Sequence, residues 1–261
     1  MCTIALIPGQ QGSLILAGNR DEQRSRKRAL PPTLHTKKDA PYTALYPVDA
    51  NAFGTWIGLN PQGLVITLLN NYQASATFDP HDHTPRSRGL IIPELLHHAS
   101  SLEDAKNHFA HAIKPHLPYT FPFILILGHA HTPDRALRIT WSGQNLDIQD
   151  ISTPHIEISS GFELDKVTQS RTQALQELLS IKDWTTHTTL AKTPDYITTL
   201  FADGAPTPTP YSVTMSRPEA HTVSHSRLVI TPQQSSITYI DGPPFNLSSR
   251  AITTLHYPTF M

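Results

Sequence analysis

Cysteine is almost absent from this chain of 261 residues, and the single one is Cys2. One cysteine excludes an intrachain disulfide framework and is typical of a reducing compartment. No apolar run reaches the roughly 18 residues that a membrane helix needs. No basic segment followed by an apolar one opens the sequence, so no signal peptide is predicted. We therefore expect a cytoplasmic globular protein without a membrane span.

An excess of charge of either sign is also missing, since 20 Lys and Arg balance 21 Asp and Glu. This balance argues against nucleic acid and against anionic membranes as partners. The basic residues cluster only in Arg24-Ser25-Arg26-Lys27-Arg28. Such a short cluster is expected to be a solvated loop or the rim of a site for an anionic ligand.

Several catalytic and cofactor motifs are absent as well. The sequence has no HExxH metal motif, no GxSxG nucleophile elbow and no glycine-rich phosphate or dinucleotide loop. Histidine is frequent, with 15 residues, but it accompanies abundant proline and threonine and shows no set of convergent ligands. We predict no metal and no cofactor.

The pattern that is present favours an α+β fold with antiparallel sheets in one domain over residues 1–261. Residues 3–7 and 13–18 form a predicted hairpin around a Pro-Gly turn, and residues 53–59 and 64–69 form a second one. Helices are expected over 87–100, over 102–113 with Ser101 as cap, and over 168–179. Further strands are expected at 121–128, 156–160, 228–230 and 237–240, with a surface loop at 205–210.

The position of Cys2 suggests a chemical role. If Met1 is removed, one residue carries both a thiol with a pKa of about 8.5 and an α-amine with a pKa of about 7.7–8.0. Near neutral pH the amine can act as the base of the thiol, which makes a complete nucleophile. The alternative is that Cys2 is a buried residue at the start of the first strand.

Three polar residues are candidates to complete such a site. Pairing of the first hairpin returns Asn19 and Asp21, placed just past the end of its second strand, toward Cys2. Asn71 follows the second hairpin. A carboxylate can hold the protonated amine, and an Asn side chain can donate to an oxyanion. Alternatively, Asn19 and Asp21 form hydrogen bonds with backbone groups of turns at strand ends, and Asn71 does the same within a local loop.

The order of the motifs resembles the NRDE family, whose eukaryotic members are called transport and Golgi organisation proteins. The resemblance rests on Met1-Cys2-Thr3, Asn19-Arg20-Asp21-Glu22, Gly54-Thr55-Trp56-Ile57-Gly58, Asn71-Tyr72 and Ser87-Arg88-Gly89. Met215-Ser216-Arg217 with Thr222-Val223-Ser224 resembles a pattern of bacterial members.

That family is similar to N-terminal-nucleophile hydrolases of the bile salt hydrolase and penicillin V acylase type. The resemblance implies a four-layer αββα sandwich, with Cys2 as nucleophile, Asp21 holding the α-amine and Asn71 as oxyanion donor. The chain departs from the hydrolases at Gly18, where they have Arg, and at Ser160, where they have a second Asn. The matched motifs make Asn19, Arg20, Ser160 and Arg217 the expected substrate-binding residues.

Two hypotheses follow. The first is an amidohydrolase that cleaves a C–N bond of a small linear amide through Cys2. The second is a binding or trafficking protein of the same fold, because the family is linked to haem mobilisation and to lipid or acyl-CoA metabolism. Its ligand would be haem or an acyl compound held without cleavage.

Overall fold

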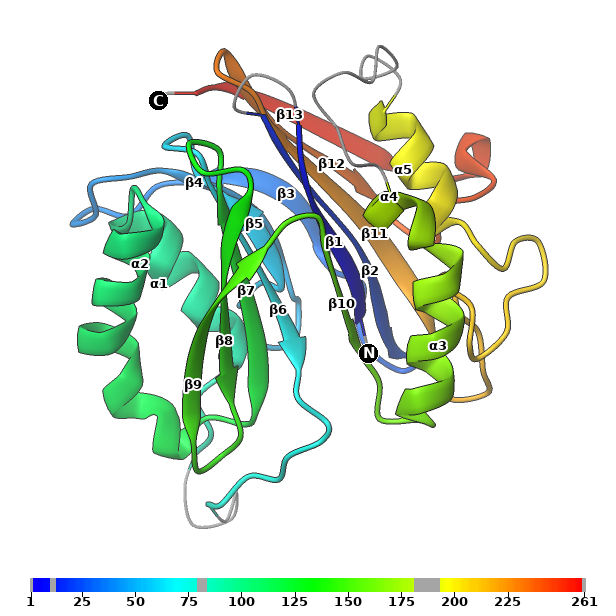
Figure 1. Cartoon of the computed structure of the whole chain (residues 1–261), viewed down its shortest axis with the longest axis horizontal. Helices are drawn as coiled ribbons and strands as arrows, with labels where there is room; N and C mark the ends of the chain where they lie inside the picture. Colours follow the sequence, from blue (N-terminus) through cyan, green and yellow to red (C-terminus); the bar gives the residue numbers. More distant parts are fainter. Residues whose placement is uncertain (1, 10–12, 79–83, 181–192, 260–261) are drawn as a thin grey trace.

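The chain folds into two antiparallel β-sheets that pack face to face (Figure 1). The computed structural model describes residues 2–9, 13–78, 84–180 and 193–259. In spatial order, the strands of the first sheet are β10 (His155–Ser159), β1 (Cys2–Pro8), β2 (Leu14–Gln23), β11 (Ala220–Ile230), β12 (Gln234–Ile240) and β13 (Ile252–Pro258). Those of the second are β3 (Leu30–His35), β4 (Ala44–Val48), β5 (Ile57–Leu59), β6 (Leu64–Asn70), β7 (Phe123–His129), β8 (Arg135–Trp141) and β9 (Leu146–Ser152).

Helices cover the outer face of each sheet (Figure 1). On the second sheet lie α1 (Ile91–His98) and α2 (Leu102–His108), with the shorter helices η2 (Arg88–Leu90), η3 (Phe109–Ile113) and η4 (Lys114–Tyr119) around them. On the first lie α3 (Leu164–Ala174), α4 (Gln176–Ser180) and α5 (Thr193–Phe201). A one-turn helix η5 (Leu247–Ser249) precedes β13. The predicted cap is confirmed, because Ser101 Oγ accepts from the amide of Asp104 at 3.0 Å.

Three apolar clusters separate these layers and confirm the expected αββα sandwich. Strand β1 shows how the sequence builds two of them. Ile4 and Leu6 point into the space between the sheets, whereas Ala5 and Ile7 pack under the helices. Both faces of the strand are buried, so its sequence reads as one continuous apolar run. The alternating faces of β1 and β2 therefore decide which side chains enter the inter-sheet space.

Two predicted boundaries are wrong. Residues 19–22 do not follow the return strand of the first hairpin but lie inside it, since β2 continues to Gln23. The reason is a long-range partner: β11 pairs with β2 as far as Ala220 opposite Gln23. In the second hairpin the first strand covers only Ile57–Leu59. Residues 53–54, expected to belong to this strand, instead close a turn. The backbone of Asp49 forms hydrogen bonds with that of Phe53 and of Gly54, and Phe53 has a positive φ.

Other predictions hold with shifted ends. The helix expected over 87–100 begins as η2 and becomes α-helical at Ile91. The helix expected over 168–179 starts earlier, at Leu164, and is divided at Leu175 into α3 and α4. Residues 205–210 form an irregular, mostly exposed loop, as expected. No helix among the described residues combines the length and apolar character that crossing a bilayer requires.

Candidate active site

Cys2 begins β1 and faces the space between the sheets. In the ladder it lies opposite Arg20 of β2 and Ser159 of β10, and directly opposed residues of antiparallel strands share a face. Its side chain packs on the inter-sheet cluster, as does Trp56. A cavity of about 140 Å³, here named the Cys2 cavity, lies at this point. Its lining is Cys2, Arg20, Glu22, Arg26, Asp49, Ala52, Gly54, Thr55, Trp56, Leu68, Asn70, Ser87, Arg88 and Gly89.

The environment of Cys2 disfavours the thiolate. Burial raises the pKa of the Cys2 thiol, the amino terminus opposes this, and the carboxylates of Asp21 and Glu22 raise it further while Arg20 lowers it. A thiol with a raised pKa is protonated near neutral pH. A nucleophilic role for Cys2 therefore needs a base beside the sulfur.

Asp21 lies behind Cys2, on the helix-facing side of β2. Its carboxylate accepts from Arg171 Nη1 at 3.0 Å and from Thr222 Oγ1 at 2.7 Å. Arg171 also donates to Thr3 Oγ1 at 2.6 Å. The side chains of Asp21 and Arg171 are fully buried. This network joins β1, β2, β11 and α3 and holds a carboxylate next to the start of β1.

Arg20 brings a guanidinium group to the same face as Cys2. Its side chain is only 4% exposed and pairs with Asp49 and with Glu22, the latter at 3.2 Å. The guanidinium carbon lies 4.2 Å from the centre of the Trp56 ring, within cation–π range. Gly18 lies on this face two residues earlier, and a Cβ there would meet Ile4 Cγ2 at 2.9 Å. The chain therefore places its arginine at position 20 and keeps position 18 small.

Asp49 was not singled out from the sequence, although it orients Arg20. Burial opposes ionisation, but the charge of Arg20, the amides of Ala52 and Asn51, and Arg26 together lower the pKa of the Asp49 carboxyl. Both amides donate to Asp49 Oδ1 at 2.9 Å. Asp49 is thus a fixed anion under two arginines at the mouth of the cavity.

The predicted Asn71 lies beside the cavity, whereas its neighbour Asn70 lines it. Asn71 Nδ2 donates to the carbonyl of Trp141 at 3.3 Å, and its Oδ1 accepts from the amide of Gln73 at 3.2 Å. Asn70 Nδ2 donates to the hydroxyl of Tyr72 at 2.9 Å. Asn70 is therefore an amide side chain in the cavity wall that the motif-based prediction did not single out.

Two neighbouring serines at the end of β10 also differ in their placement. Ser160 is buried, and its hydroxyl donates to the carbonyl of Phe162 at 2.6 Å within a local turn. Ser159 lies opposite Cys2, and its hydroxyl donates to the carbonyl of Asn70. Ser159 thus connects the two sheets next to Cys2. A Ser-Ser or Asn-Asn pair contains no signal that tells which member faces inward.

In the part of the chain that the structure describes, the Cys2 cavity is not lined by the remaining two predicted binding residues, Asn19 and Arg217. Asn19 Nδ2 donates to the carbonyls of Phe201 and Val213 at 2.9 and 3.1 Å, and its Oδ1 bonds His225 Nδ1 at 2.8 Å. Arg217 pairs with Glu219 at 2.7 Å. Asn19 thus anchors the segment after α5 to β2.

The motifs at residues 54–58 and 87–89 contact each other next to the cavity through Gly54 and Gly89. The amide of Thr55 donates to the carbonyl of Gly89 at 2.9 Å. A Cβ on Gly54 would lie 2.5 Å from the carbonyl carbon of Gly89, so only glycine permits this approach. Arg88 donates to the carbonyl of Pro122 at 2.8 Å, and burial lowers the pKa of its guanidinium. The packing of these glycines places Arg88 in the cavity wall.

One set of possible metal ligands occurs away from this cavity, on the outer helices. Glu94 Oε1 lies 3.6 Å from His98 Nε2 and 3.0 Å from His108 Nε2. All three ligand atoms lie within 4.8 Å of one another. Lys37 pairs with the other oxygen of Glu94 at 3.1 Å. Helices α1 and α2 thus hold a local ion-pair cluster that the sequence pattern did not indicate.

The fold is that of several solved hydrolases. A variant of conjugated bile acid hydrolase from Clostridium perfringens is 13% identical, with a TM-score of 0.55 over 100% of this chain and 98% of that one. Penicillin V acylase from Agrobacterium tumefaciens is 12% identical, with a TM-score of 0.50 over 98% and 91% of the chains. The Caenorhabditis elegans ortholog of N-acylethanolamine-hydrolyzing acid amidase is 12% identical, with a TM-score of 0.55 over 87% and 92%.

These neighbours define the fold class: the αββα sandwich of this chain is the fold of the N-terminal-nucleophile hydrolases. No curated protein sequence matches the chain. The model of the family Transport and Golgi organisation 2 matches residues 1–239. The chain belongs to that family, as the ordered motifs predicted.

Proposed function

We propose that this protein is a cysteine N-terminal-nucleophile amidohydrolase that acts on small linear amides. The observation that carries the proposal is the placement of Cys2 in an inter-sheet cavity, directly opposite Arg20, with the buried Asp21 carboxylate behind it. The solved neighbours support the same class, because their names describe a hydrolase of conjugated bile acids, an acylase of penicillin V and an amidase that hydrolyses N-acylethanolamines.

The proposed reaction begins with removal of Met1, which leaves the α-amine on Cys2. The amine takes the thiol proton, and Sγ attacks the acyl carbon of the amide. The C–N bond breaks, and the departing nitrogen receives the proton from the α-ammonium group. Water, deprotonated by the amine, then cleaves the thioester to a carboxylic acid and restores the thiol. The raised pKa of the Cys2 thiol supports the need for such a base.

Asp21 fits the role of holding the α-ammonium group, since it is a buried carboxylate next to the start of β1. An oxyanion on the acyl carbon needs a donor in the cavity. The family resemblance assigns this role to Asn71, whereas the cavity lining favours Asn70. Arg20 and Arg88 add positive charge on the walls of the same cavity.

Intact mass of the purified protein, followed by an amide panel, tests the proposal. The panel contains a conjugated bile acid, penicillin V and an N-acylethanolamine. We expect Met1 to be absent and the Cys2→Ala variant to lose all turnover that wild type shows. Retained Met1, or full turnover by Cys2→Ala, contradicts the mechanism.

Matched Asn70→Ala and Asn71→Ala variants assign the oxyanion donor. Loss of the true donor is expected to lower kcat on the order of 10²- to 10³-fold, with a small effect from the other variant. A larger loss from Asn71→Ala would restore the assignment by family resemblance. Equal small effects would exclude both side chains as the donor.

The alternative function is binding of an acyl or haem ligand without cleavage. It is favoured by two positions that lack the polar group of the hydrolases, Gly18 without a side chain and Ser160 with its hydroxyl bonded in a turn. Ligand binding unchanged in Cys2→Ala, together with no turnover of any amide in the panel, would support this function.

A further inference from the structure

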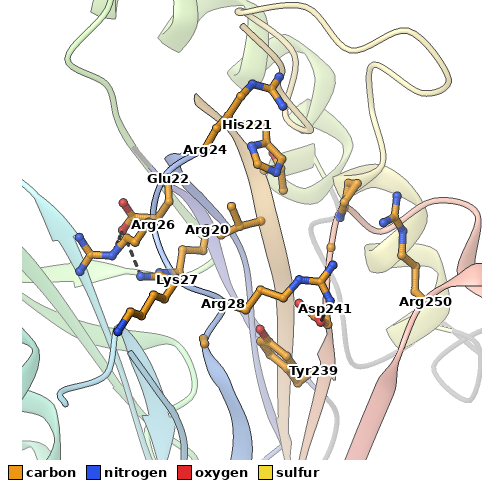
Figure 2. A pocket seen from close by; sticks show the side chains of 15 residues that line it. Arg20, Glu22, Arg24, Arg26, Lys27, Arg28, His221, Tyr239, Asp241 and Arg250 are labelled. Atoms are coloured by element: carbon orange, nitrogen blue, oxygen red, sulfur yellow. Dashed lines mark hydrogen bonds and ion pairs between the residues drawn. The ribbon is translucent and has the colours of Figure 1, made fainter. Parts of the chain in front are cut away.

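A second and larger cavity, here named the basic cleft, lies beside the Cys2 cavity and has a volume of about 330 Å³. It lies between the loop after β2, the start of β11 and the segment after β12. Figure 2 shows Arg26 and Lys27 on one side and Arg250 on the other, with Arg24 beside His221 and Arg28 beside Asp241 between them. Its lining is Arg20, Glu22, Arg24, Arg26, Lys27, Arg28, Ala29, His221, Thr222, Val223, Tyr239, Asp241, Gly242, Pro243 and Arg250.

The charge of this lining is strongly one-sided, with six Lys and Arg side chains against the carboxylates of Glu22 and Asp241. Arg28 pairs with Asp241 at 2.9 Å. Arg20 and Arg26 pair with Glu22 and with Asp49. Half of the cations are thereby neutralised, and Arg24, Lys27 and Arg250 are left.

These three cations have no carboxylate partner in the part of the chain that the structure describes. Arg24 donates only to neutral groups, the carbonyls of Arg217 and Pro218 and the hydroxyl of Ser216. Arg250 Nε is buried and has no hydrogen-bond partner. The three cations are therefore not neutralised by carboxylates and can interact with an anion.

Burial and the positive charge of the cleft lower the pKa of His221. Burial lowers the pKa of its imidazole, and the positive charge of Arg24 lowers it further, as does that of Arg250, while Asp21 opposes them. His221 Nδ1 is itself buried without a hydrogen-bond partner. The side chain is thus a neutral hydrogen-bonding group held between two cations.

The backbone is shaped to admit Arg250. Gly242 has a φ of +131°, and a Cβ there would meet Arg250 Nη1 at 3.0 Å and Cδ at 3.1 Å. Glycine at this position therefore lets the guanidinium lie against the turn after β12.

We propose that the basic cleft binds the phosphate group of an organophosphate ligand whose other end reaches Cys2. Arg20, Glu22 and Arg26 line both cavities, so the cavities adjoin, and an extended ligand seated in the cleft would cross these side chains to reach Cys2. A phosphate group carries about −1.5 to −2 charge and three strong acceptor oxygens, which matches several cations better than a carboxylate does. Arginine forks also suit phosphate oxygens. As a statement about the substrate, this inference rests on the proposed hydrolase function, but the binding itself does not require cleavage.

Calorimetric titration of the full chain with inorganic pyrophosphate tests the cleft directly. We expect saturable 1:1 binding that weakens as ionic strength rises. The double variant Lys27→Gln/Arg250→Gln is expected to bind at least about tenfold more weakly, since charge-assisted bonds are lost. The matched control Lys38→Gln/Arg135→Gln removes the same charges from exposed positions outside the cleft and should change the affinity less than about twofold.

Gly242→Ala provides a variant that keeps every charge but displaces Arg250, and it should weaken pyrophosphate binding in the same direction. No binding by wild type, an equal loss in the control double variant, or acetate binding as tightly as pyrophosphate would each overturn the inference. The titration is repeated with Cys2→Ala. Unchanged pyrophosphate binding there, with no amide turnover by wild type, would refute the hydrolase while the phosphate site stands. Turnover without pyrophosphate binding would refute the phosphate site alone.

Discussion

The buried ion pair between Asp21 and Arg171 gives the most direct test of how the fold holds the region behind Cys2. Replacing Arg171 with Met keeps most of the side-chain volume but removes the cation. The Asp21 carboxylate then remains buried with its Thr222 bond and without the guanidinium. Thr3 on β1 also loses its bond to Arg171.

The magnitude follows from the complete burial of both side chains. Removing one partner of a buried ion pair leaves an uncompensated charge and typically costs about 3–5 kcal/mol. Coulomb's law gives a similar size, because two unit charges about 4 Å apart at an effective dielectric of about 20 interact by roughly 4 kcal/mol. We therefore expect Arg171→Met to lower the free energy of unfolding by about 3–5 kcal/mol.

Urea denaturation followed by circular dichroism measures this change. The comparison requires that the slope of unfolding free energy against urea concentration be the same in wild type and in the variant. Arg135→Met is the control, since Arg135 pairs with Asp150 at 2.6 Å but with side chains 54% and 58% exposed. Exposed pairs contribute little, so no measurable change is expected there. The double variant Asp21→Asn/Arg171→Met should recover part of the loss, because the buried carboxylate that lost its guanidinium partner is then replaced by a neutral amide.

Equal unfolding free energies for Arg171→Met and Arg135→Met would refute the reasoning. So would a double variant less stable than Arg171→Met, because it would show that the Asp21 carboxylate without its guanidinium partner is not the source of the cost.

Two further predictions concern pH and backbone packing. Burial and the charge of Arg227 lower the pKa of His225 to about 3, so the folded protein holds this imidazole neutral while the unfolded chain protonates it near pH 6.5. Below about pH 6.5 the unfolded state binds this extra proton. As the pH falls from roughly 6.5 to 3, His225 should therefore lower the free energy of unfolding by up to about 1.4 kcal/mol per pH unit. In His225→Gln, which keeps a donor toward Asn19, equilibrium denaturation at several pH values should give a shallower decline; an unchanged slope would contradict the assignment. Gly54→Ala should lower the free energy of unfolding by about 1–3 kcal/mol, because the new Cβ would lie 2.5 Å from the backbone of Gly89. A thermal melt equal to that of wild type would show that this approach of the two motifs is not tight in solution.

Local patterns in the sequence determined much of this protein. The Pro-Gly turn and the flanking apolar runs specify the first hairpin, and antiparallel pairing alone brings the segment around Arg20 back to Cys2. Ser101 specifies a helix start because its side chain bonds an amide three residues away. Each of these features depends on neighbours in the chain, so each was predictable.

Tertiary structure alone decided how the members of the neighbouring pairs are placed around Cys2. Strand register puts Asn70 rather than Asn71 in the lining of the Cys2 cavity and Ser159 rather than Ser160 opposite Cys2, and a shift of one residue reverses every face of a strand. The Asp21–Arg171 pair joins residues 150 positions apart, and no local pattern announces such a partner. The sequence by itself determined that a thiol and a carboxylate lie near one another at the first hairpin, and that amide side chains follow the second. Packing of distant strands and of α3 decided which atoms meet, because only the assembled sheets set side-chain direction and burial.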